Sequence, residues 1–166
     1  MTEELYFDRP ILALYPNTHG FGYALFFDKD KPLHYGMAKL RVRKVEACLR
    51  RIDKMIVTYN PSILILPSPD GKHNRKRERI QALLSEIHEY ATEKGLQVRI
   101  YSRENIRIAF ASYKAYSKQQ IAETICECVP ELGDKCPRQR TNYETESFLQ
   151  GMFDAISLAY THYYFE

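Results

Sequence analysis

The strongest local concentration of charge in this sequence is a basic segment just before residue 80. It places five lysine and arginine side chains within eight residues: Lys72, Arg75, Lys76, Arg77 and Arg79. Cations at this density can neutralise the phosphates of a nucleic-acid backbone, a contact that gives affinity without reading sequence. A charged run is also common on solvated surfaces. The segment alone therefore leaves both interpretations open.

A second group of side chains alternates aromatic and basic character. Tyr113 and Tyr116 flank Lys114 in the stretch ASYKAYS. Aromatic rings can stack on bases while a neighbouring cation contacts phosphate, as in sites that bind single strands. Four more arginines could widen such a surface: Arg103, Arg107, Arg138 and Arg140. Together the two groups favour nucleic-acid binding dominated by phosphate contacts, with low sequence specificity.

Carboxylates that could share a metal ion are sparse. Asp154 lies in a strongly apolar segment near the end of the chain, and the neighbours expected on its helical face are not acidic. Glu146 precedes it by eight residues, roughly 12 Å along a helix. No spacing of cysteine and histidine is typical of zinc. The residues alone therefore do not predict a metal centre.

The hydrophobic pattern indicates the elements that must position these side chains. Apolar and β-branched runs predict strands at residues 11–14, 21–27, 33–41, 63–66 and 96–101. Spacings of three and four predict helices at residues 45–59, 80–91, 103–110, from 118 and from about 144 to 163. Residues 15–20 are rich in turn-formers and are expected to form a turn. This order predicts an α/β fold with a mixed five-stranded sheet and helices on both faces.

Length and composition limit the classes of protein that remain. At 166 residues and 45% hydrophobic residues, the chain suits one folded domain over residues 1–166. A formal charge of +3 is too small to indicate nucleic acid by itself. No apolar run reaches the ~18 residues of a membrane span, and the start lacks a secretory core. We therefore expect a soluble, cytoplasmic protein without a membrane partner.

Two motifs near the ends of the chain make the interpretation more specific. Residues 11–23 read ILALYPNTHGFGY, a hydrophobic strand, a turn and a second strand that opens with Gly-Tyr. Residues 152–162 read MFDAISLAYTH, with Asp-Ala near the start and Thr-His at the end. With the element order, these motifs resemble the RuvC-like Holliday junction resolvases of the RNase H-like superfamily. The resemblance covers nearly the whole chain and implies an RNase H-like fold.

The resemblance also implies a chemistry and the positions that would perform it. In that family two divalent ions, Mg²⁺ or Mn²⁺, activate water for cleavage of a phosphodiester, and acidic side chains hold the ions. The four acid positions fall on Tyr15, Pro67, Gly151 and Asp154, with Ser68 in place of Pro67 if the register shifts by one residue. Only Asp154 is acidic, so three of the four positions are lost. Tyr15 could stack on a base or fill a vacated metal pocket.

The predicted function is therefore a RuvC-like protein with a degenerate two-metal site that binds branched or structured DNA without efficient cleavage. It requires no metal cofactor. One alternative is an active endonuclease that uses Mg²⁺ or Mn²⁺ on Asp154, Asp70 and Glu146. A second is a protein-interaction module on the same scaffold. The resemblance also allows a homodimer, and DNA and RNA remain undistinguished as ligands.

Overall fold

A mixed sheet of five strands organises the protein in the order β3-β2-β1-β4-β5. The computed structural model describes residues 9–41, 44–69, 75–137 and 149–166, apart from the side chains of residues 75 and 76. The strands are β1 (Ile11–Asn17), β2 (Gly20–Asp28), β3 (Lys31–Lys39), β4 (Ile63–Pro67) and β5 (Gln97–Tyr101). The first three form an antiparallel meander, and β4 runs parallel to both β1 and β5. This confirms the predicted sheet.

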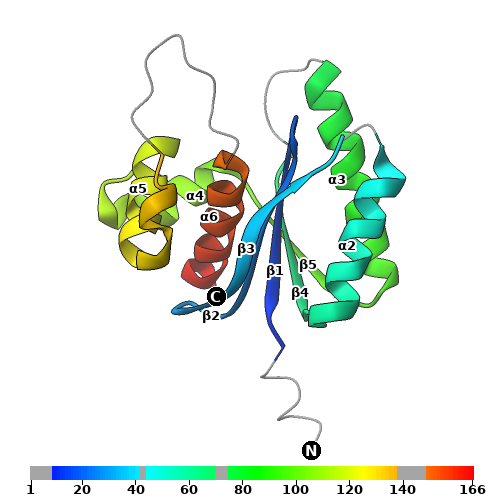
Figure 1. Cartoon of the computed structure of the whole chain (residues 1–166), viewed down its shortest axis with the longest axis horizontal. Coiled ribbons are helices and arrows are strands. Elements are labelled where there is room, and N and C mark those ends of the chain that lie inside the picture. Colours follow the sequence, from blue (N-terminus) through cyan, green and yellow to red (C-terminus); the bar gives the residue numbers. More distant parts are fainter. Residues whose placement is uncertain (1–8, 42–43, 70–74, 138–148) are drawn as a thin grey trace, which may run out of the picture.

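Helices cover both faces of the sheet (Figure 1). One layer consists of α2 (Val45–Tyr59) and α3 (Arg75–Glu93). The other contains α4 (Arg103–Phe110), α5 (Lys118–Cys128) and α6 (Gln150–Phe165), with the short 3-10 helices η1 (Ala111–Tyr113) and η2 (Pro130–Lys135). Alternation along β1 sends Leu12 and Leu14 into the core under α2 and α3, and Ile11 and Ala13 into the core under α6. The predicted two-sided architecture is confirmed.

The expected turn at residues 15–20 is shorter than predicted, and this changes the position of Tyr15. Strand β1 continues through Tyr15, Pro16 and Asn17, which pair with Gly22, Phe21 and Gly20 of β2. Only Thr18 and His19 form the turn. Pro16 is tolerated because the pairing of β1 with β4 ends at Ala13, so its missing N–H interrupts no ladder on that side. Cross-strand pairing outweighs the turn-forming composition.

Helix α6 is the central element of the second layer. Residues 150–159 are all buried, with Tyr160 partly exposed. A Cβ atom at Gly22 of β2 would fall on the carbonyl oxygen of Gly151, so the helix lies directly against the strand. The helix begins at Gln150, later than the predicted start near residue 144, and residues 144–148 lie outside the described part. In the described segments, no helix is long and apolar enough to cross a bilayer.

His162 connects the end of α6 to the edge of the sheet. It is buried, its Nδ1 atom lies 2.9 Å from the hydroxyl of Tyr101, and Glu166 Oε1 is 4.0 Å away. Burial lowers the pKa of His162 below 6.5, against the opposing effect of Glu166. As the pH falls, His162 therefore binds a proton in the unfolded chain at a higher pH than in the folded chain.

This asymmetry predicts a pH dependence of stability. Because the unfolded state binds the proton first, the free energy of unfolding should fall as pH drops below about 6.5. Urea titrations of wild type and His162→Gln between pH 5 and 8 measure this slope, which the substitution should flatten. His88→Gln, at an exposed position on α3, should keep the wild-type slope. An unchanged slope in His162→Gln would assign the effect to another group.

Candidate nucleic-acid interface

Tyr15 lies where the sheet opens at the carboxyl end of β1. The pairing of β1 with β4 stops at Ala13 and Ile65, two residues before Tyr15. Open α/β sheets bind ligands at this edge because the strands diverge there. The ring of Tyr15 is half-buried and packs against the core under α6. It therefore fills the first of the predicted acid positions and contributes to packing.

A lysine from α5 reaches the same position. The side chain of Ser117 accepts a hydrogen bond from the backbone N–H of Gln120, and Gln120 reaches back to the N–H of Ser117. This capping box makes Lys118 the first residue of α5. Its Nζ atom lies 5.9 Å from the centre of the Tyr15 ring, within cation–π range. The start of α5 thus places an ammonium over the aromatic ring.

The carboxylate of Asp154 is engaged by protein groups on both oxygens. Its Oδ2 atom lies 3.5 Å from Lys118 Nζ, and its Oδ1 accepts a 3.1 Å hydrogen bond from Gln150 Nε2. Asp154 is only 5% exposed, so the ion pair is shielded on its acidic side. A buried charge requires such compensation. The ammonium of Lys118 thus lies within reach of both the Asp154 carboxylate and the Tyr15 ring.

Positive charges outnumber the single carboxylate around the Tyr15 hydroxyl. Burial raises the pKa of Tyr15 above 10.0 and Asp154 adds to that effect, whereas Lys118, Arg103 and Arg77 oppose it. Each of the three cations lies in the first turn of a different helix. The positive ends of helix dipoles add to the same sign. Glu78 and Glu104 also lie in the first turns of α3 and α4, but among the described groups that act on the Tyr15 hydroxyl itself three are cations and one is a carboxylate, a balance that favours an anion at this position.

The residues at the four acid positions do not fit a divalent ion. Tyr15 stays protonated at neutral pH because its pKa is raised. Pro67 and Gly151 offer no side-chain donor, and Asp154 is held by Lys118. Across the described residues, no three His, Cys, Asp or Glu side chains gather closely enough to hold a metal. The alternative ligands Asp70 and Glu146 lie outside the described residues.

Crowding explains why position 151 has no side chain. A Cβ atom there would lie 2.6 Å from both Asn17 Nδ2 and Met37 Sδ. These are ends of flexible side chains, so they could move, but a carboxylate would need still more space. A larger side chain at residue 151 would therefore have to displace the side chains of Asn17 in β1 and Met37 in β3.

Comparison with known proteins identifies the architecture. No protein-family model matches the sequence, and no curated protein matches it. Among solved structures, Thermus thermophilus RuvC in complex with a Holliday junction substrate matches with a TM-score of 0.70 and 17% identity, over 95% of this chain and 94% of that one. The chain has the RuvC fold. A structure described simply as that of Thermus thermophilus RuvC matches with the same TM-score and identity, over 94% of each chain.

The chain is also similar in structure to a Holliday junction resolvase from yeast. The yeast mitochondrial Holliday junction resolvase has a TM-score of 0.57 and 10% identity, over 93% of this chain and 77% of that one. These structural matches establish the RuvC fold. Because the sequence identities are only 17% and 10%, the chemistry of this chain has to be argued from its own residues. The predicted resemblance is confirmed at the level of fold.

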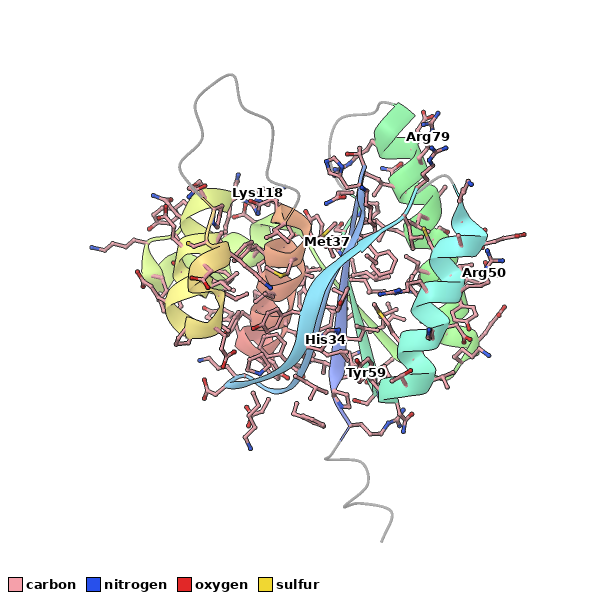
Figure 2. The ribbon with its side chains drawn as sticks, viewed as in Figure 1. His34, Met37, Arg50, Tyr59, Arg79 and Lys118 are labelled. Atoms are coloured by element: carbon pink, nitrogen blue, oxygen red, sulfur yellow. The ribbon has the colours of Figure 1, made fainter. Side chains whose placement is uncertain are left out.

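Within the RuvC fold, the two described side chains of the predicted basic segment, Arg77 and Arg79, lie at the Tyr15 end of the sheet. The charge of Arg77 lowers the pKa of the Tyr15 hydroxyl. Arg79 is exposed on the same part of α3. Figure 2 shows Arg79 and Lys118 at the same end of the molecule, on α3 and α5 on either side of the sheet. Lys72 lies outside the described residues, as do the side chains of residues 75 and 76. The cationic edge, as described, consists of Arg77, Arg79, Arg103 and Lys118.

The aromatic and basic stretch near residue 113 lies apart from this edge. Tyr113 is 53% exposed and, with Lys29 and Cys128, lines a small pocket beside the turn between β2 and β3. That turn is at the opposite end of the strands from Tyr15.

The neighbours of Tyr113 in sequence differ in surroundings. Lys114 borders a hollow lined also by Glu123 and Glu127, while Tyr116 is 56% exposed just before Lys118. Of the predicted stacking residues, Tyr116 is the one next to the cationic edge in sequence.

Lys118 is the residue that sequence reasoning missed. Its only local signal is its place directly after the N-cap Ser117, where a cation opposes the helix dipole. Such a cation is slightly unfavourable at this position, and the ion pair with Asp154 compensates for it. The sequence alone does not identify Asp154 as the partner of Lys118, because 36 residues separate the two.

Proposed function

We propose that this protein binds branched or structured DNA at the cationic edge and does not cleave it efficiently. The observation that carries the proposal is the ion pair of Lys118 and Asp154 beside Tyr15, at the place where the resemblance puts a metal-binding carboxylate cluster. A RuvC of the same fold is described in complex with a Holliday junction substrate. The fold thus supports junction binding, and the altered residues support the loss of cleavage.

The chemistry of the edge favours binding over hydrolysis. Arg77, Arg103 and Lys118 can contact backbone phosphates directly, which an acidic metal site could do only through bound cations. Hydrolysis needs an activated water, and among the described side chains near Tyr15 the one carboxylate is already paired with Lys118. Tyr15 itself stays protonated. Among the described side chains, the edge thus offers cations for phosphate, while the carboxylate that acts on Tyr15 is held in an ion pair.

A binding and cleavage panel tests the proposal directly. Four-way junctions, forks, duplexes and single strands are incubated with the full chain, with and without millimolar Mn²⁺. We expect a shift of branched DNA at low salt and no products. Cleavage that Asp154→Asn abolishes would instead establish an endonuclease with relocated ligands. Absence of any shift would favour a protein-interaction module, and light scattering on the same samples tests the homodimer.

The salt dependence of binding should report the arginines of α3. Because each lost phosphate contact lowers the slope of log K against log salt by about one unit, Arg77→Gln/Arg79→Gln should lower it by about two. Fluorescence anisotropy from 50 to 200 mM salt measures the slope. The matched control, Arg50→Gln/Lys94→Gln, removes two exposed cations away from the cationic edge. Equal slopes for both variants would remove α3 from the interface.

A further inference from the structure

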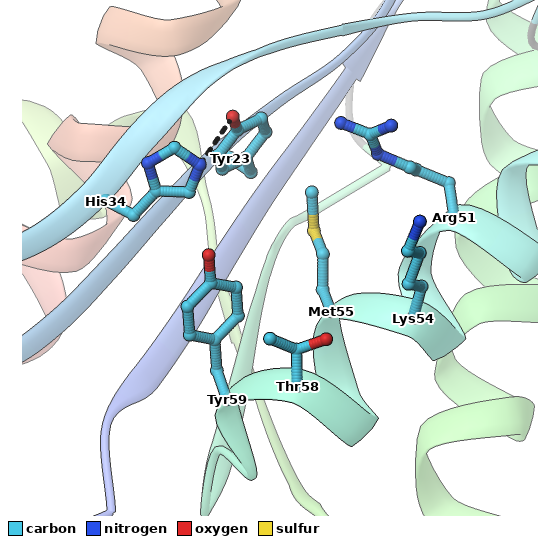
Figure 3. Close-up of a pocket in the computed structure, with 7 residues that line it drawn as sticks. All are labelled: Tyr23, His34, Arg51, Lys54, Met55, Thr58 and Tyr59. Atoms are coloured by element: carbon cyan, nitrogen blue, oxygen red, sulfur yellow. Dashed lines mark hydrogen bonds between the residues drawn. The ribbon is translucent and has the colours of Figure 1, made fainter.

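A pocket on the opposite face of the sheet is separate from the cationic edge. It lies between α2 and the antiparallel strands and has a volume of about 210 Å³. Two of its residues come from β2 and β3, and five come from α2: Tyr23, His34, Arg51, Lys54, Met55, Thr58 and Tyr59. Figure 3 shows the two cations on one side and the rings of His34 and Tyr59 on the other. The pocket therefore has a charged wall and an aromatic wall.

The charged wall carries two cations without a carboxylate opposite them. Arg51 and Lys54 are three residues apart on α2, so they project from one face of the helix. None of the seven lining residues is acidic. Asp53, between them in sequence, accepts a hydrogen bond from Tyr90 of α3 and so is directed to the other helix. Across the described segments, no ion pair involves Arg51 or Lys54. The wall is suited to a phosphate.

The aromatic wall is held in place by contacts among its own rings. The rings of Tyr23 and His34 are 5.1 Å apart, and those of His34 and Tyr59 are 6.1 Å apart. The Tyr23 hydroxyl lies 3.0 Å from His34 Nε2. Gly36, the partner of Tyr23 in β3, provides the space, because a Cβ atom there would lie 2.8 Å from that hydroxyl. The rings are thus fixed before any ligand arrives.

The two walls also lie close enough to act on one ligand. Arg51 lowers the pKa of the Tyr23 hydroxyl, although burial raises it overall, so the guanidinium is within electrostatic reach of the aromatic wall. Met55 and Thr58 lie between the walls (Figure 3). A volume near 210 Å³ is below the roughly 300–1,000 Å³ of pockets for drug-sized ligands. The pocket would therefore enclose only part of a larger ligand, and the rest would lie over the exposed side chains of Arg51, Lys54 and Thr58.

We propose that this pocket binds a single nucleotide, with its phosphate against Arg51 and Lys54 and its base against the rings of His34 and Tyr59. A phosphate ester with a flat ring matches both walls, whereas phosphate alone matches one. The nucleotide is either free or the phosphorylated end of a strand. The site does not depend on the proposed function, because it shares no residue with the cationic edge and lies across the sheet from the core on which Tyr15 packs.

Calorimetric titration of the full chain with AMP, adenosine and inorganic phosphate tests the match to both walls. We expect AMP to bind about tenfold more tightly than either fragment, since stacking and charge-assisted hydrogen bonds each contribute. Arg51→Gln should weaken AMP about tenfold. Arg50→Gln is the matched control, because Arg50 is adjacent and exposed but does not line the pocket. Circular dichroism verifies that the variants are folded.

Two further experiments test the role of the aromatic wall and the source of the nucleotide. Tyr59→Leu should reduce AMP affinity to that of ribose 5-phosphate. Competition with single-stranded oligonucleotides, with and without a 5′-phosphate, distinguishes the sources: displacement of AMP only by the phosphorylated strand indicates a strand end, and no displacement indicates a free nucleotide. Absence of AMP binding at millimolar concentration, or equal losses in Arg50→Gln and Arg51→Gln, would overturn the proposal.

Discussion

Lys118→Met is expected to destabilise the protein and, under the proposed function, to weaken junction binding at the same time. Asp154 is 5% exposed and would keep only its hydrogen bond from Gln150 among the partners described above. Removing one partner of a fully buried pair lowers the free energy of unfolding by about 3–5 kcal/mol. Because the Lys118 side chain is 32% exposed, we expect a smaller loss of about 2–3 kcal/mol. Urea denaturation and junction binding measure the two effects.

A double variant separates the two roles of Lys118. In Lys118→Met/Asp154→Asn the buried charge is gone, and the amide can still bond to Gln150. We expect at least half of the lost stability to return while junction binding stays weak. A double variant as unstable as Lys118→Met would show that the charge of Asp154 is not the cause. Recovery of binding together with stability would remove Lys118 from the DNA interface.

Gly22→Ala will disrupt the packing of α6 on the sheet. The added methyl group would fall on the carbonyl oxygen of Gly151, and backbone at the buried start of a helix cannot move aside as a side chain can. Overpacking usually lowers the free energy of unfolding by about 1–3 kcal/mol, and we expect this clash to reach about 3 kcal/mol or more. Thermal and urea unfolding followed by circular dichroism measure the loss.

The matched control for this substitution is Gly133→Ala. A Cβ atom at Gly133 would meet nothing within 4 Å, and the residue is exposed in η2. It should therefore unfold close to wild type. Comparable losses in both variants would mean that the contact between Gly22 and Gly151 does not limit stability.

The architecture could be predicted from sequence because each element carries a local signal. The continuous apolar run at residues 63–66 is typical of a strand buried in a parallel sheet, and β4 occupies that place. The run at 33–41 is more polar, as is typical of a strand at the edge of a sheet, and β3 is an edge strand. The prediction of a turn at Pro16 and Asn17 was wrong. Both residues are common in turns, but here they belong to β1 because they pair with β2. That pairing is not a local property.

The site was only partly predictable for the same reason. The motifs placed Tyr15 and Asp154, and the structure brings both to the cationic edge. The ion pair with Lys118 could not be derived, since it joins two helices far apart in sequence. Tyr113 and Lys114 looked like part of a binding surface because their sequence neighbours are basic and aromatic. Folding places Lys114 beside Glu123 and Glu127 instead.

The ammonium of Lys118 acts as a counterion that the chain itself supplies. A dissolved divalent ion can be diluted or chelated, and its occupancy depends on its concentration. A tethered ammonium has an effective concentration fixed by the start of α5, where the capping box holds it next to Asp154. The charge of Asp154 is therefore balanced by a group that the fold itself brings into place, through the ion pair with Lys118.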